Sequence, residues 1–222
     1  MILVRDSLAE QIRIELRTRI LSGRYALGER INVDLVASDL NVSQSPVKEA
    51  LKQLEREGLV EIRPRSGTIV RRFTRQELTD IYGTRRIIEP AASGLAVTQG
   101  AVTPDLLARL EQTMDALADA SSGPQFMHPL EVTEADSTFH RLIVDSVGNA
   151  ILTVMHSSLI DRAHLVRNFA SRGPRARETL AEHRRIIDAL RAGDAQEAHD
   201  ATLDHLKSAE FDINRSMEAP PP

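Results

Sequence analysis

Three histidines and one aspartate in the C-terminal two-thirds of the chain are spaced so that they could bind one metal ion. Asp136 and His140 are four residues apart, which on a helix places them about 40° apart on one face. His183 and His205 each lie in line with the apolar residues of another helical pattern, so both imidazoles are expected to face a helical core. One carboxylate and three imidazoles suit a divalent cation, with zinc first and manganese, nickel or iron as alternatives, rather than calcium.

The remaining histidines give weaker signals. Any single histidine that faces a core is more simply explained by a backbone hydrogen bond, so only the four groups together favour a metal. His156 and His164 lie on one predicted helix and could line the same cavity or be exposed. His199-Asp200 resembles the central pair of helical metal-dependent phosphohydrolases, but it lies about 240° around its helix from His205 and so faces elsewhere. The sequence offers no convincing general base or nucleophile besides the predicted ligands, which counts against an enzyme.

A second chemical signal lies at the start of a predicted helix near the N-terminus. Ser43 can cap this helix, and Pro46 is tolerated in its first turn. Apolar residues recur at helical spacing between Val47 and Leu54, so one face is expected to be buried. The outer face has the hydroxyl, amide and ammonium groups with which a recognition helix contacts phosphates and base edges. These candidate DNA contacts are Ser43, Gln44, Ser45, Pro46, Lys48 and Lys52.

The elements around this helix predict a winged helix-turn-helix. A short amphipathic helix at 33–40 and a turn at 41–42 precede it, and Gly58 can end it in a left-handed conformation. Two short strands, 60–62 and 68–70, follow. The basic loop between them adds three candidate DNA contacts: Arg63, Arg65 and Gly67. The alternative is a small helical hairpin packed on another element, which does not explain why a basic loop and a hydroxyl-rich helix start occur together.

Composition and charge indicate a two-domain protein that contacts DNA through one end. The chain has 222 residues, 41% of them hydrophobic, and no cysteine, which excludes disulfides and thiolate metal sites. Residues 1–72 have 13 basic and 10 acidic side chains, whereas residues 73–222 have 15 and 22. A mildly basic head on an acidic body fits DNA binding by the head. Because no signal peptide or 18-residue apolar run is present, we expect a cytoplasmic protein without membrane contact.

The predicted fold is mainly α, with an N-terminal winged helix-turn-helix followed by an all-α antiparallel bundle of about six helices. A first helix is expected over 7–21, with a connector at 27–31. The predicted helices of the second domain lie near 74–98, 103–121, 131–146, 149–170, 175–192 and 194–215.

Taken together, these segments resemble the GntR family of bacterial transcription regulators, in its FadR-like branch with a helical C-terminal effector domain of the FCD type. The resemblance covers residues 7 to about 215. It is strongest at 43–51, 54–60, 85–92, 136–140, 182–183 and 205–206. It implies a homodimeric, ligand-responsive regulator of a palindromic DNA operator. It also implies a metal held by Asp136, His140, His183 and His205, with a small carboxylate effector beside it.

The resemblance further implies an effector contact. Arg85 matches the family's cavity arginine, although a surface ion pair explains it equally well from sequence alone. Asn149 and Arg162 could also reach the cavity. In most such regulators the effector releases the DNA, so we expect a repressor. The alternatives are a metal-sensing regulator without an organic effector and, less favoured, a helical metal-dependent hydrolase.

Two departures from the family concern DNA reading. Gln44 and Lys48 stand where the family often has arginine, and glutamine pairs with adenine whereas arginine favours guanine. Asp34 replaces a basic residue that some relatives use for DNA contact. Both differences allow for an operator unlike the usual family sequence.

Overall fold

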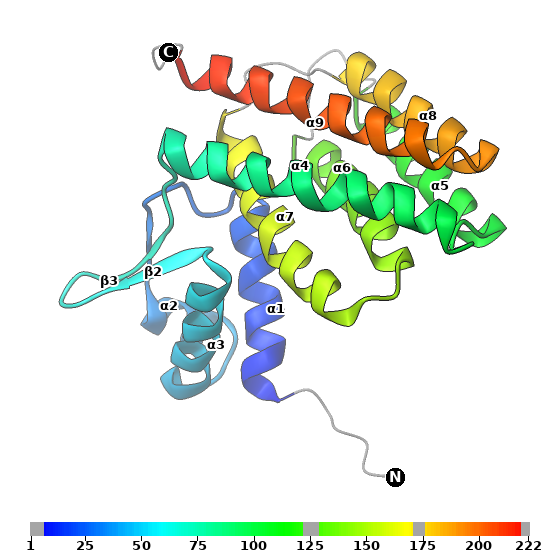
Figure 1. The fold of residues 1–222 in the computed structure, drawn as a ribbon. Helices are drawn as coiled ribbons and strands as arrows, with labels where there is room; N and C mark the ends of the chain where they lie inside the picture. The colour runs from blue at the N-terminus through cyan, green and yellow to red at the C-terminus, as the bar shows by residue number, and fades with distance from the viewer. Residues whose placement is uncertain (1–6, 122–128, 171–175, 219–222) are drawn as a thin grey trace, which may run out of the picture. The chain divides into compact units, whose positions relative to one another are not determined.

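The computed structural model describes residues 7–121, 129–170 and 176–218, and the chain divides into two compact units, Met1–Phe73 and Thr74–Pro222. The described part of unit 1 consists of three helices and a small sheet (Figure 1). In chain order its elements are α1 (Leu8–Leu21), β1 (Arg30–Ile31), α2 (Val33–Asp39), α3 (Gln44–Glu57), β2 (Val60–Arg63) and β3 (Gly67–Val70).

Helix α3 confirms the expected amphipathic pattern. Its buried face consists of Val47, Ala50, Leu51 and Leu54, and it packs against α1 and α2. It ends at Gly58, whose φ of 79° lies in the left-handed region that glycine adopts without strain. One detail of its start differs from expectation, because Ser43 occupies the N-cap position but its hydroxyl makes no capping hydrogen bond. Pro46 removes one of the two possible donors, since it occupies the third helical position and has no N–H.

The sheet of unit 1 is antiparallel, with the strand order β1-β3-β2. The hairpin register pairs Val60 with Val70 and Arg63 with Gly67. Strand β1 was expected to be a connector, because two residues carry no recognisable period. It forms by pairing with β3, where Ile31 lies opposite Thr68. The hairpin β2–β3 is the wing that follows the helix-turn-helix.

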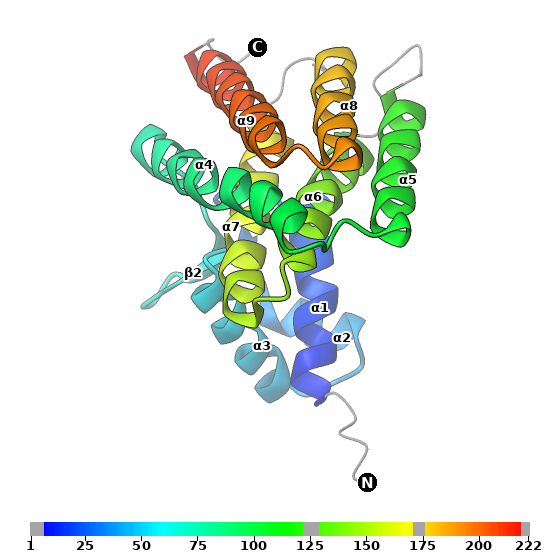
Figure 2. The same ribbon diagram turned by 45° about the vertical axis from the view of Figure 1, so that its right-hand side comes forward.

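Unit 2 is helical throughout its described residues and confirms the expected bundle. Its helices are α4 (Arg75–Thr98), α5 (Pro104–Ser121), α6 (Pro129–Ser146), α7 (Ala150–Ala170), α8 (Ala176–Ala192) and α9 (Ala195–Glu218). Helix α4 starts with a capping box, in which Thr74 and Glu77 satisfy each other's backbone N–H groups. Helix α9 packs along both α4 and α8, while α6 lies against α4, α5 and α7 (Figure 2).

The apolar core of unit 2 lies between α5, α6, α8 and α9. It is formed by buried residues that include Leu110, Phe139, Ile186 and Leu190. The ring of Phe139 stacks on the imidazole of His183 at 3.9 Å between centroids, so the core continues directly into a cluster of polar side chains. Within the described ranges, none of the helices combines the length and the apolar character needed to cross a membrane.

Candidate functional site

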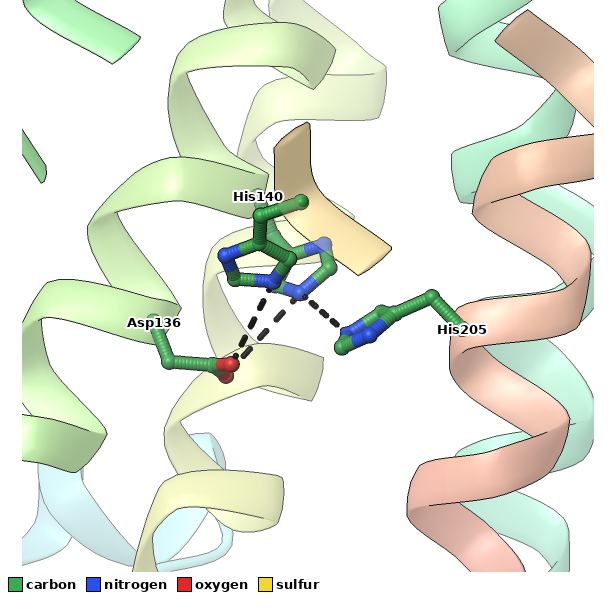
Figure 3. Close-up of side chains that lie close together, drawn as sticks. Asp136, His140 and His205 are labelled. Carbon is green, nitrogen blue, oxygen red and sulfur yellow. Dashed lines mark hydrogen bonds and ion pairs between the residues drawn. The ribbon is translucent and has the colours of Figure 1, made fainter. Parts of the chain in front are cut away.

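Four side chains from three helices converge inside unit 2. Asp136 and His140 are on α6, His183 is on α8 and His205 is on α9, and each is about 1% exposed. One ligand atom from each lies within 4.8 Å of the other three. Figure 3 shows Asp136 and His140 on the same helix, both directed toward His205 on the facing helix. The structure therefore brings together all four residues that the sequence suggested as metal ligands.

The distances within this cluster are those of ligands around a single ion. The Nε2 atoms of His140 and His205 are 3.1 Å apart. His183 Nε2 is 3.5 Å from one oxygen of Asp136, and His140 Nε2 is 3.9 Å from the other. Two nitrogens bound to one zinc ion, each about 2.0–2.1 Å from it, are roughly 3.0–3.4 Å apart. Small side-chain shifts would thus complete the coordination.

Two carboxylates behind the cluster orient two of the imidazoles. His140 Nδ1 lies 2.8 Å from an oxygen of Glu89, and His205 Nδ1 lies 2.8 Å from an oxygen of Glu182. An ionised carboxylate only accepts hydrogen bonds, so each Nδ1 carries the proton that it donates. The Nε2 atoms then have their lone pairs directed at the centre of the cluster, which is the tautomer that a metal ion requires.

Two further atoms at the centre have no hydrogen-bond partner. They are Asp136 Oδ1 and His183 Nε2, both fully buried. A buried polar atom without a partner costs about 1–3 kcal/mol, so such atoms are uncommon in stable proteins. A cation between them would satisfy both. This observation, together with the nitrogen-rich donor set, shows that the residues present fit a divalent metal ion.

The electrostatics of the cluster favour the protonation states that bind metal. Burial lowers the pKa of His183 well below its usual value, and the neighbouring His205 lowers it further. Burial also lowers the pKa of His205, against the opposing effect of Glu182. For Asp136, burial raises the pKa, but the charge of Arg167 and the imidazoles outweigh it, so the pKa is well below normal. These shifts keep His183 and His205 neutral and Asp136 ionised, which are the states that bind a metal ion.

Arg85 faces the bundle interior rather than the surface. It is 1% exposed, and its Nε donates to Glu89 Oε1 at 2.7 Å while Nη2 lies 3.4 Å from Oε2. The same carboxylate contacts His140 and, at 3.0 Å, His156. The guanidinium also lies over the Tyr82 ring, 5.0 Å from its centroid. Arg85 is thus an internal ion-pair partner that helps to hold a carboxylate behind a candidate metal ligand.

The other two effector candidates are placed differently. Asn149 is exposed, and its Oδ1 accepts from the backbone N–H groups of Ile151 and Leu152, both at 3.1 Å. It caps the start of α7, and its role as an effector contact stays a prediction. An asparagine directly before a helix commonly caps it, because its side chain satisfies the first free N–H groups. Arg162 is half-buried on α7.

Several residues at the site were not assigned a role from the sequence. Arg167 of α7 donates from Nη1 to Asp136 Oδ2. Glu89 and Glu182 lie in segments already recognised as family-like, yet nothing in their spacing revealed that they orient imidazoles. His156 and His164 are buried, so exposure, one of the two alternatives for them, is excluded. In contrast, the pair His199-Asp200 is half-buried, with side-chain exposures of 40% and 46%, and lies outside the cluster.

In unit 1, the predicted DNA contacts lie on one exposed surface. The side chains of Ser43, Gln44, Ser45, Lys48 and Lys52 are exposed along α3, as are Arg63 and Arg65 on the wing. Pro46 and Gly67 are half-buried on the same elements. A groove of about 420 Å³ runs between α2, α3 and the sheet, and its lining includes Gln44, Lys48 and Lys52. Gln44 Nε2 donates to Asp34 Oδ1 in this groove. Asp34, which stands where some relatives have a basic residue, therefore contacts the glutamine that is predicted to read a base.

Comparison with known proteins agrees with both halves of this description. The FCD domain matches residues 80–208, and the gntR family of bacterial regulatory proteins matches residues 8–70. The chain is 29% identical over 204 residues to the "Probable D-xylose utilization operon transcriptional repressor" of Paenarthrobacter nicotinovorans, covering 92% of this chain and 88% of that protein. It is also 29% identical over 191 residues to the gluconate operon transcriptional repressor of Bacillus licheniformis, covering 84% and 74%.

A solved structure resembles this chain over most of its length. The crystal structure of a GntR transcriptional regulator from Rhodococcus sp. RHA1 has a TM-score of 0.81 at 25% identity, covering 93% of this chain and 97% of that chain. The family match over more than half of the chain, the winged head and the buried aspartate–histidine cluster agree with one another. The chain belongs to the gntR family of bacterial regulatory proteins and has the FCD domain, so it is a DNA-binding transcription regulator and not an enzyme.

Proposed function

We propose that this regulator is a repressor that binds a palindromic operator as a homodimer and is switched by a small organic acid bound beside a divalent metal. The observation that carries the proposal is the buried cluster of Asp136, His140, His183 and His205 with its two supporting carboxylates. The names of the xylose and gluconate relatives support repression as the mode of action. The gluconate protein acts on an operon named for a carboxylate sugar acid, which suits an anionic effector here.

The metal is held by the four clustered residues, with zinc as the first candidate and manganese, nickel or iron as alternatives. These candidate metals differ in coordination number, and this number decides whether an effector can also bind the ion. A tetrahedral ion that takes all four protein ligands is closed and leaves no position for an effector. An ion with five or six ligands keeps one or two positions open, and an effector carboxylate can take them. Effector binding therefore favours an octahedral metal, or zinc with an expanded shell.

The DNA contacts are assigned to the exposed face of α3 and to the wing. Gln44 and Lys48 read base edges, whereas Arg63 and Arg65 contact phosphates. A dimer presents two such heads, so its operator is expected to be an inverted repeat whose half-sites are spaced by the dimer geometry. The effector can switch the protein only if it binds one arrangement of the two heads better than another.

A selection experiment tests the proposal without knowledge of the operator. The metal-loaded protein is used to select DNA from a random double-stranded pool, and the bound sequences are inspected for a twofold repeat. A set of small organic acids is then titrated into the complex with the selected DNA, with and without metal. Selected DNA without twofold symmetry would contradict the dimeric operator. If metal alone changes DNA affinity and none of the acids does, the protein is a metal sensor.

A further inference from the structure

Arg167 links the candidate metal site to the edge of the bundle. Its guanidinium donates to Asp136 Oδ2, and the two side chains are 18% and 1% exposed. The second oxygen of Asp136 is the buried atom without a hydrogen-bond partner that faces His183. Asp136 therefore has one oxygen for the metal and one for Arg167. A group that replaces Asp136 at Arg167 would lie directly beside the metal.

The two interior arginines differ in how firmly their partners are held. Glu89, the partner of Arg85, is 2% exposed at its side chain and also contacts His140 and His156. An anion that displaced Glu89 from Arg85 would disturb the orientation of a metal ligand. Asp136, the partner of Arg167, gains a second cationic partner when the metal binds. Arg167 can then exchange part of its ion pair at a lower cost than Arg85.

Charge counting at the site leads to the same residue. Five charged side chains belong to the cluster or contact its members directly or through Glu89: Arg85, Arg167, Glu89, Asp136 and Glu182. Their net charge is −1 when the histidines are neutral. A divalent ion changes the sum to +1. An uncompensated buried positive charge is unfavourable, so the metal-loaded site attracts an anion. The anion is expected next to the cation that is least compensated.

A neighbouring hydroxyl adds a second polar group for such an anion. The phenol oxygen of Tyr82 is buried and has no hydrogen-bond partner. Burial raises the pKa of Tyr82, against the opposing charges of Arg85 and Arg167, while Asp136 contributes to the increase. The phenol is thus protonated and available as a donor, and its ring lies against the Arg85 guanidinium, with 5.0 Å between the guanidinium and the ring centroid.

We propose that Arg167, rather than Arg85, binds the carboxylate of the effector, with the Tyr82 hydroxyl as a second donor and the metal as the third contact. This inference rests on the proposed function and names the anion partner within it. The Arg85–Glu89 pair then has a positioning role, since it holds His140. Arg167 exchanges Asp136 for the incoming carboxylate, so effector binding is coupled to the metal through a shared aspartate.

The test compares Arg167→Gln with a matched control, Arg141→Gln. Arg141 forms an ion pair with Asp161 that also joins α6 to α7, with side-chain exposures of 25% and 4%. Both substitutions thus remove one half-buried arginine from the same helix pair, but only one of them touches the cluster. Full-length, manganese-loaded protein is titrated calorimetrically with acetate, succinate and citrate. Metal content is measured in the same samples by elemental analysis.

We expect Arg167→Gln to keep its metal and to bind the responsive carboxylate about 10- to 100-fold more weakly, as for loss of one charged hydrogen-bond pair. Arg141→Gln should match the wild type. Equal carboxylate affinity in wild type and Arg167→Gln would overturn the inference, and so would loss of metal from Arg167→Gln, since the arginine would then serve the metal. If metal-loaded wild type binds none of the acids, the carboxylate-effector proposal itself fails. If Arg85→Lys weakens carboxylate binding and Arg167→Gln does not, Arg85 is the residue that binds the carboxylate.

Discussion

His140 and His205 direct their Nε2 atoms at each other across 3.1 Å, although the Nδ1 atom of each faces a carboxylate oxygen at 2.8 Å. If both protons are on Nδ1, two lone pairs face each other in a buried space. Only a shared proton or a cation makes this arrangement favourable. The unpartnered atoms of Asp136 and His183 beside it favour the cation.

The first prediction concerns metal content. Purified protein should contain about one divalent ion per chain, and a His183→Ala, His205→Ala double variant should contain none. Because the ion binds only the folded state, free metal at about 1,000 times its Kd should add roughly 4 kcal/mol to the free energy of unfolding. Thermal melts with and without chelator measure this difference. His199→Ala, which removes a half-buried histidine outside the cluster, is the control, and full metal content in the double variant would reject these ligands.

The second prediction concerns the carboxylate behind His205. Glu182→Gln removes the charge that holds Nδ1 protonated, while the amide keeps a similar shape. Loss of such a supporting group typically weakens metal affinity about 10- to 100-fold. Glu178→Gln, an exposed change in the first turn of α8, should leave affinity unchanged. Competition with a fluorescent chelator measures both. Equal affinities in the two variants would mean that Glu182 does not support the ligand.

The third prediction concerns the stability of the metal-free protein at acidic pH. The pKa values of His183 and His205 are lowered in the folded state, chiefly by burial, from an ordinary value near 6.5. As the pH falls below about 6.5, the unfolded chain therefore binds protons that the folded chain does not, so the free energy of unfolding decreases. The slope approaches about 1.4 kcal/mol per pH unit for each histidine.

Urea denaturation of chelator-treated protein between pH 7.5 and 5.5 measures this slope. Asp136 and Glu89 do not interfere, because their lowered pKa values affect stability only as carboxylates protonate at lower pH. His183→Asn should flatten the dependence, whereas His199→Gln should not. A wild-type protein equally stable at both pH values would show that the folded state protonates these imidazoles as readily as the unfolded chain does.

The fourth prediction concerns DNA. Gln44→Ala and Lys48→Ala should each cost roughly 1–3 kcal/mol of discrimination between the selected operator and altered sequences. Arg65→Ala on the wing should weaken binding to all sequences alike, as loss of a phosphate contact does. Lys207→Ala, an exposed change on α9 in unit 2, is the control. Fluorescence anisotropy with operator and base-substituted duplexes measures both effects. Unchanged discrimination in both α3 variants would place the reading surface elsewhere.

The fifth prediction concerns the contact between Asp34 and Gln44. A carboxylate can only accept, so Asp34 holds the amide nitrogen of Gln44 and presents the carbonyl edge outward. We expect Asp34→Ala to release this side chain and to broaden the base preference at the position that Gln44 reads. Sequencing of DNA selected by the two proteins from the same random pool tests this. Identical base preferences would mean that Asp34 does not orient the glutamine.

The local elements could be inferred from sequence because their signals are local. The apolar spacing from Val47 to Leu54, Gly58 at the end of α3 and the helical periods of unit 2 depend only on neighbours within a few turns. The four candidate ligands could also be found, because each lies on the apolar face of a helix where a polar group stands out. Strand β1 could not, since its two residues become a strand only by pairing with β3.

The partners of the charged residues were decided by the tertiary structure. From sequence alone, Arg85 could have been a surface ion pair or a free cavity cation, and the fold makes it a buried partner of Glu89. Asn149 was a cavity candidate, and in the fold it caps α7. Arg167 gave no signal, because its contact with Asp136 joins residues 31 positions apart on different helices. Sequence pattern determines which face a side chain occupies, but only the packing of α6 against α7 determines which charge it meets there.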